Sequence, residues 1–366
     1  MFKKSLTVIA LAGAFVGSAM AANVTLYGAV DAGFQFKNVH FQKGAHENTF
    51  KMTDGINTPN QIGLKGVEEI SDNLKVGFKL ENGFNLSNGT FDNKENRLFN
   101  RESILFVESV AGTFAMGREG AISSGFGKFA KFGGAVSAMG NGRADVPGLK
   151  FVTGMTAQRF NNSVIYETPS IAGFSLIGQY ANEAQGEHGY LDNENDRFLA
   201  LGATYKSQDL YGTFIVDQFK RKADKNGLKF SFGGNVKATE DLQLFAAAQF
   251  YDKVALNVIS LSEKVMGKTD FVKGFGTNLG ASYKLGNGTV KGDFGFAHAK
   301  RIDDTHYKLN RFIVAAGYDY ALSKRTTVYT DMGAMFDRYK NLADTAADKG
   351  NHANTFVANV GMVHKF

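Results

Sequence analysis

The sequence predicts an all-β protein, a transmembrane antiparallel β-barrel of about sixteen strands, an even number as bacterial barrels have. Three observations carry this prediction. The chain begins like a secreted protein, long segments alternate apolar with polar residues, and the last residue, Phe366, ends such a segment. In a barrel the final strand closes against the first, and a terminal aromatic ring can lie at the membrane surface.

The N-terminal segment has the form of a secretory signal peptide. A pair of lysines is followed by an apolar run from Leu6 to Gly17 and by a small-x-small cleavage site that ends at Ala21. The apolar run is too short to cross a bilayer as a helix. We therefore expect residues 1–21 to be removed and residues 22–366 to form one barrel without a separate plug domain.

Composition favours strands and excludes several classes of function. The 366 residues include 43 Gly, 33 Phe and 13 Tyr but only 3 Pro, a residue that breaks ladder hydrogen bonds. There is no Cys, so thiolate metal sites, redox sites and disulfides are excluded. The formal charge of +6 is mildly basic and lacks the basic stripe of a nucleic-acid binder, so no nucleic-acid partner is expected.

A period of two marks the strands. In the first segment Val24, Leu26 and Phe34 share one parity, while Thr25 and Asp31 share the other. This spacing places the two sets on opposite faces of a strand. The segments run to about ten residues, which suffices to cross a bilayer at a tilt and exceeds a typical soluble strand. Further segments with this pattern cover residues 74–81, 228–237, 290–297 and 355–365.

Short turn signals alternate with longer polar stretches. This rhythm is typical of outer-membrane barrels, which have short turns on the periplasmic side and long loops outside. The turn signals lie at 71–73, 111–112, 207–209, 239–241, 286–288 and 322–324, and the longer stretches at 40–58, 87–97, 184–195, 255–270 and 341–354.

One further stretch, residues 119–158, is rich in glycine and does not alternate. A structureless loop of this length is uncommon unless it has a function. In an outer loop Phe126, Phe129, Phe132 and Phe151 would face water. We therefore expect this loop, the long third one, to fold into the lumen and narrow it.

The chain resembles the general Gram-negative porins, a family of trimeric diffusion channels. The resemblance implies a homotrimer of sixteen-stranded barrels, a third loop folded inside each pore, and a C-terminal Phe366 that the barrel assembly machinery recognises. It rests on short motifs that occur in order along the chain, at 23–28 (NVTLYG), 62–69 (IGLKGVEE), 84–89 (FNLSNG), 98–101 (LFNR), 117–118 (GR), 162–169 (NSVIYETP) and 360–366 (VGMVHKF).

The resemblance also implies a constriction at which basic side chains on the wall face the inserted loop. The family often has an arginine before the Ile-Gly-Leu motif, where this chain has Gln61. The wall candidates are Arg101 and Arg118 within the motifs, Arg159 beside one, and Lys65, Lys75 and Lys79 by their parity; the loop candidates are Glu119, Lys128, Lys131 and Asp145.

The expected function is passive diffusion of small hydrophilic solutes and ions across the outer membrane. The loop also holds Arg143 and Lys150 and has few acids, and fixed charges in a pore select counter-ions. A weak preference for anions follows. Lipid and lipopolysaccharide are the expected surroundings, and no cofactor or metal is implied.

Three other functions compete with this reading. An outer-membrane enzyme needs a converging nucleophile, base and acid, and no HExxH, GxSxG or paired metal spacing occurs. A channel specific for a sugar or an anion would be favoured if Phe126, Phe129 and Phe132 lined the pore as a track. A structural or adhesive barrel would conduct no ions at all.

Overall fold

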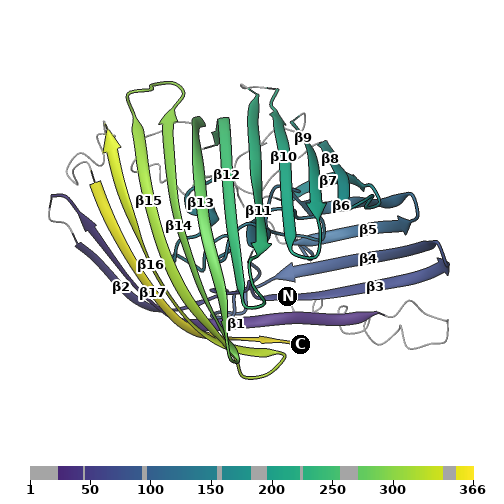
Figure 1. Cartoon of the computed structure of the whole chain (residues 1–366), viewed down its shortest axis with the longest axis horizontal. Helices are drawn as coiled ribbons and strands as arrows, with labels where there is room; N and C mark the ends of the chain where they lie inside the picture. The colour runs from purple at the N-terminus through teal and green to yellow at the C-terminus, as the bar shows by residue number, and fades with distance from the viewer. Residues whose placement is uncertain are drawn as a thin grey trace, which may run out of the picture.

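A single antiparallel sheet that closes on itself forms the body of the computed structural model (Figure 1). The structure describes residues 24–43, 46–92, 97–154, 159–182, 196–222, 226–255, 271–340 and 352–366. The expected signal peptide lies outside these residues. No helix in the described ranges is long and apolar enough to cross a membrane.

The described part of the chain contains seventeen strand segments, each paired with its neighbour along the chain or with β1. They are β1 (Thr25–Phe41), β2 (His46–Asp54), β3 (Gln61–Ser71), β4 (Leu74–Gly83), β5 (Glu102–Ser109), β6 (Gly112–Gly120), β7 (Arg159–Glu167), β8 (Phe174–Asn182), β9 (Arg197–Lys206), β10 (Leu210–Lys220), β11 (Gly227–Lys237), β12 (Leu242–Ala255), β13 (Phe271–Leu285), β14 (Gly288–Arg301), β15 (Lys308–Ala321), β16 (Thr326–Lys340) and β17 (His352–Lys365).

Two of these segments share one position in the barrel. β2 pairs with residues 32–40 of β1 and β3 pairs with residues 25–29, so both lie along the same edge. The seventeen described segments therefore make sixteen strands around the barrel, which confirms the expected number. The 40–58 stretch expected to be a loop contains β2; its polar residues alternate with Phe50 and Met52, which face outward and are exposed.

The interruption between β2 and β3 has a local cause. Gly55 has φ +62°, a left-handed conformation that glycine adopts without steric penalty. The chain then turns so that the Asn57 and Thr58 amides donate to Asp31 Oδ2 at 2.7 and 2.6 Å. Asn60 Oδ1 in turn accepts from the Asp31 amide at 2.6 Å. Residues 55–60 are thus held against β1 by the carboxylate and the backbone of Asp31.

The last strand closes the barrel against the first. β1 and β17 pair from Ala29–Lys365 to Phe41–Ala353. The backbone of Phe366 extends this ladder, because its amide donates to Gly28 at 3.1 Å and its carbonyl accepts from Gly28 at 3.0 Å. The terminal residue therefore belongs to the closing pair, as expected.

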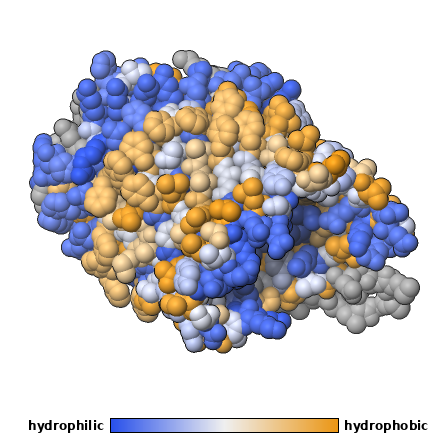
Figure 2. Space-filling model, viewed as in Figure 1, coloured by the Kyte–Doolittle hydropathy of each residue, from blue (hydrophilic) through white to orange (hydrophobic). Residues whose placement is uncertain are grey.

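The two faces of the sheet differ as the period of two predicts. On β15 the side chains of Phe312 and Val314 are 44 % and 46 % exposed, whereas Arg311 and Ile313 are 5 % and 1 % exposed. Hydrophobic side chains gather in a band across the strands, with hydrophilic residues along the upper rim (Figure 2). A belt of this kind is what a membrane-spanning barrel presents to lipid.

Connections at the two ends of the barrel differ in length. Residues 72–73, 110–111 and 286–287 join strands at one end, whereas 84–101 and 121–158 are longer connections at the other. The connection between β6 and β7, residues 121–158, is called the third loop below. It includes two short 3-10 helices, η1 (Gly133–Ala135) and η2 (Leu149–Phe151).

Candidate pore constriction

The third loop connects β6 and β7, but it is fixed to strands β11 and β14, which are distant from them along the sheet. The Ser137 hydroxyl donates to Asp293 of β14, and the Ala138 and Met139 amides donate to the same carboxylate at 3.2 and 3.1 Å. On β11, Asn235 Nδ2 donates to the Ala135 carbonyl at 2.8 Å. These wall residues belong to the face opposite the exposed apolar belt.

Glycines in the wall make room for the loop. A Cβ added at Gly276 of β13 would lie 1.5 Å from the Val152 carbonyl oxygen. At Gly333 of β16 it would lie 2.6 Å from Pro147 Cδ, and at Gly233 of β11 it would lie 2.7 Å from Val136 Cγ1. The loop therefore packs directly on the backbone of three strands.

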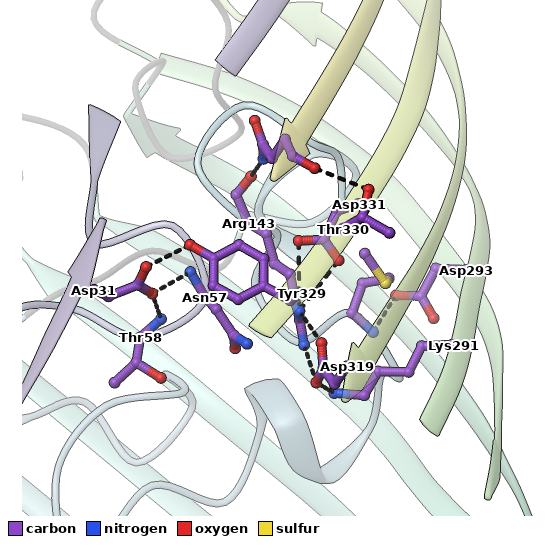
Figure 3. A network of polar contacts seen from close by, with 12 residues as sticks. Asp31, Asn57, Thr58, Arg143, Lys291, Asp293, Asp319, Tyr329, Thr330 and Asp331 are labelled. Carbon is purple, nitrogen blue, oxygen red and sulfur yellow. Dashed lines mark hydrogen bonds and ion pairs between the residues drawn. The ribbon is translucent and has the colours of Figure 1, made fainter. Parts of the chain in front are cut away.

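Arg143 is the centre of a polar network between the loop and strands β14 to β16 (Figure 3). Its guanidinium binds Asp319 of β15 through two hydrogen bonds of 2.6 and 2.9 Å and Asp331 of β16 at 3.1 Å. Lys291 Nζ on β14 contacts Asp319 at 2.6 Å. Paired hydrogen bonds between an arginine and a carboxylate fix orientation as well as distance.

A second contact joins the loop to residues 55–60. Asp31, which holds those residues, also accepts a hydrogen bond from the Tyr329 hydroxyl (Figure 3). The Tyr329 ring lies 6.0 Å from the Arg143 guanidinium carbon. Ile56 is buried against Tyr329 and Val363. The interruption in the second strand and the third loop thus meet over the same part of β16.

The wall near β4 carries a different cluster of charges. Arg101 Nε donates to Glu81 Oε1 at 2.7 Å. Lys79 Nζ lies 3.6 Å from Glu81 and also contacts Glu102. The Tyr27 hydroxyl donates to Glu81 at 2.9 Å. Glu81 is therefore held by two cations and a phenol.

A cavity of about 770 Å³ lies between these two clusters. Its described lining includes Gly55 to Asn57, Phe126, Phe245 and the loop from Ser137 to Ala144. Among these described residues the lining is cationic, with one carboxylate against five basic groups. The charged members are Glu81, Lys79, Arg101, Arg143, Lys150 and Lys291.

Two of the ten residues expected at the constriction, Lys79 and Arg101, line this cavity. Arg118 instead donates to the Asn100 carbonyl at 2.7 Å and to Asn161 Oδ1 at 2.6 Å. The Arg159 guanidinium carbon lies 5.2 Å from the centre of the Phe126 ring.

The other expected residues contact the wall elsewhere. Lys75 pairs with Glu69, and Lys65 Nζ lies 5.2 Å from the Tyr27 ring centre. Lys128 pairs with Glu108 at 2.9 Å, Lys131 with Glu167 at 2.6 Å, and Asp145 with Lys37 at 3.2 Å. Glu119 is fully buried beside Gly127. Lys128 and Lys131 therefore tie the loop to β5 and β7.

No motif of the sequence marks Glu81 or Lys291 as a constriction residue, although both lie in segments that alternate apolar with polar residues. Arg143 and Lys150 were noted only as loop charges. Lys150 Nζ donates to the Ala144 carbonyl at 2.7 Å. Burial lowers the pKa of this ammonium group, and the nearby Asp145 opposes that effect.

The aromatic track that a sugar-specific channel would use is not formed by all three phenylalanines. Phe129 and Phe132 are each 2 % exposed and lie in apolar clusters, and only Phe126 of the three lines the cavity. In the described ranges, no group of three or more His, Asp or Glu side chains is placed to hold a metal ion.

Known proteins resemble this chain over its whole length. The family described as Gram-negative porin matches residues 5–341. An outer membrane porin protein of Bordetella pertussis is 29 % identical, with both chains fully covered. The anion-selective porin from Comamonas acidovorans is 21 % identical and superposes with a TM-score of 0.68, over 94 % of this chain and all of that one. OmpT of Vibrio cholerae, in a trimer form, is 14 % identical with a TM-score of 0.57, at the same coverage.

Proposed function

The chain belongs to the Gram-negative porin family, and we propose that its lumen passes small anions in preference to cations. The protein is an outer-membrane barrel channel through which small hydrophilic solutes diffuse passively. The observation that carries the proposal is the cationic lining of the cavity among the described residues. Passive diffusion requires no catalytic group, and we propose no enzymatic role.

The first step of the proposal is that the third loop lies in the lumen and narrows it. Its support is the set of contacts to inward-facing residues on strands from β11 to β16. A loop attached to β6 and β7 can reach those strands by crossing the interior. The narrowing then sets the size of solute that passes.

The ion preference follows from the charges that line the cavity. Carboxylates that pair with Arg143 and Lys291, namely Asp319 and Asp331, are not among the residues that line the cavity. Of these ion pairs, the cations line the cavity and the acids do not, so a solute in the cavity meets the positive partners. Since a ring of fixed charge favours counter-ions, the path favours anions.

The test is the reversal potential across a salt gradient in a planar bilayer. We expect wild-type protein to show an anion preference and the Lys150→Glu variant to show a weaker or inverted one. Lys324→Glu makes the same charge change in the exposed turn between β15 and β16 and should leave the potential unchanged. Cation preference in the wild-type protein would contradict the proposal.

We further propose that three chains associate into a homotrimer. Residues 1–21 are removed on export. The barrel assembly machinery recognises Phe366. The trimer form of OmpT and the apolar outer belt support association within lipid and lipopolysaccharide. Chemical cross-linking in detergent should give a trimer, and N-terminal sequencing should begin at Ala22. Deleting Phe366 should lower the amount of folded protein in the outer membrane.

A further inference from the structure

Two histidines face each other at the end of the β1–β2 pair that lies away from the short turns. His40 and His46 are directly opposed in the register of the two strands. Their Nδ1 atoms are 3.1 Å apart and their ring centres 4.3 Å apart, and the pair is exposed. Neither residue lines the cavity.

The separation of the two nitrogens matches that of two ligands on one metal ion. Zinc binds histidine nitrogen at about 2.0–2.1 Å. Two such nitrogens, at angles between square-planar and tetrahedral, lie about 2.9–3.4 Å apart. The observed 3.1 Å lies inside this range. An ion could therefore replace the proton that the two nitrogens share in the hydrogen-bonded pair.

The backbone holds this geometry before any ion arrives. From the His40–His46 pair, the β1–β2 ladder continues along both strands as far as the Ala32–Asp54 pair. On the same face, Asn38 Nδ2 donates to Asn48 Oδ1 at 2.7 Å, and the rings of Phe34 and Phe50 stack with centres 5.8 Å apart. Because both strands are fixed in register, little backbone ordering accompanies metal binding.

We propose that His40 and His46 together bind a divalent transition-metal ion, Zn²⁺, Ni²⁺ or Cu²⁺, at the outer rim of the barrel. Neutral imidazole is a preferred ligand of these ions. No third His, Asp or Glu is gathered with the pair in the described part of the chain, so water completes the coordination. The ion clamps the end of the hairpin and lies outside the solute path.

The test is titration of untagged, folded protein in detergent with Zn²⁺ and Ni²⁺, followed by calorimetry. We expect His40→Asn and His46→Asn each to weaken binding at least tenfold. His306→Asn, which removes an exposed histidine from the 302–307 connection, should bind as wild type does.

Amide hydrogen exchange provides a second readout that depends on location. Zn²⁺ should slow exchange in residues 46–54 of the wild-type protein and leave the His40→Asn variant unaffected. Unchanged affinity in both single variants, or protection confined to another part of the barrel, would overturn the assignment. So would the absence of any binding by wild-type protein, since the pair would then be a hydrogen bond only. Anion preference is measured separately, so the two proposals can fail independently.

Discussion

Arg143 joins the third loop to two carboxylates of the barrel wall. It is 5 % exposed and binds two carboxylates, while its own carbonyl accepts from Asn359 Nδ2 at 2.9 Å. If the Arg143 side chain is removed, Lys291 is the one cation of this cluster that remains beside Asp319 and Asp331. Breaking one side of a buried ion pair costs roughly 3–5 kcal/mol.

We therefore expect Arg143→Ala to loosen the loop, with a larger and noisier single-channel conductance and a lower midpoint of urea unfolding. Arg338→Ala is the matched control, because Arg338 is exposed on β16 and donates to the Asp337 carbonyl and to Asn354. Equal conductance and stability in the two variants would show that Arg143 does not hold the loop.

A substitution at Gly276 tests the packing of the third loop on the wall by adding side-chain volume instead of removing a charge. A Cβ there meets the Val152 carbonyl at 1.5 Å, so either the loop or β13 must move. Overpacking of this kind typically costs about 1–3 kcal/mol. We expect Gly276→Ala to raise conductance and lower the unfolding midpoint, both measured as for Arg143→Ala. Gly212→Ala adds the same methyl where nothing lies within 4 Å and should change neither.

At the scale of single elements, barrel closure depends on the approach of β17 to β1. A Cβ at Gly28 would lie 2.4 Å from the Phe366 ring and 2.5 Å from the Gln61 carbonyl oxygen. Gly28→Ala should therefore lower the temperature at which the folded barrel unfolds, as seen by its mobility on a gel after heating. Gly178→Ala, whose new Cβ meets Leu201 at an ordinary 3.5 Å, should unfold like wild type.

The strands were more predictable from the sequence than the interruption between β2 and β3. The outward residues of β15 and β17 recur every second position because lipid and interior lie on opposite faces. The sequence of β2 predicts a loop because its inward residues, Glu47, Thr49 and Lys51, are as polar as those of a loop. β2 ends at Asp54 because Gly55 turns the chain and because the Asp31 carboxylate, which is distant in sequence, accepts from the Asn57 and Thr58 amides.

The site was less predictable, because residue type and parity say which face a side chain occupies but not its partner. Arg118 and Arg159 lie in motifs that suggest the constriction, yet Arg118 binds Asn100 and Asn161, and Arg159 covers Phe126. Lys291 joins the lining because the third loop passes it. The path of that loop depends on contacts such as that of Gly276 with Val152, and such contacts leave no repeating pattern in the sequence.

For the whole molecule, the proposed anion preference should depend on ionic strength in a way set by the size of the cavity. A sphere of 770 Å³ has a radius of about 6 Å, between the Debye lengths of about 10 Å at 0.1 M and about 3 Å at 1 M salt. At the lower concentration the lining cations act across the full width of the path. At the higher one their field is screened within it.

We therefore expect the ratio of anion to cation permeability to fall when a tenfold gradient is moved from about 0.01–0.1 M to about 0.1–1 M salt. The measurement is the reversal potential at both ranges on the same channels. The Lys150→Glu variant should change less between the ranges, since part of the screened charge is gone. A ratio that stays constant in the wild-type protein would instead assign selectivity to contacts closer than the Debye length, made as each ion passes the narrowest point.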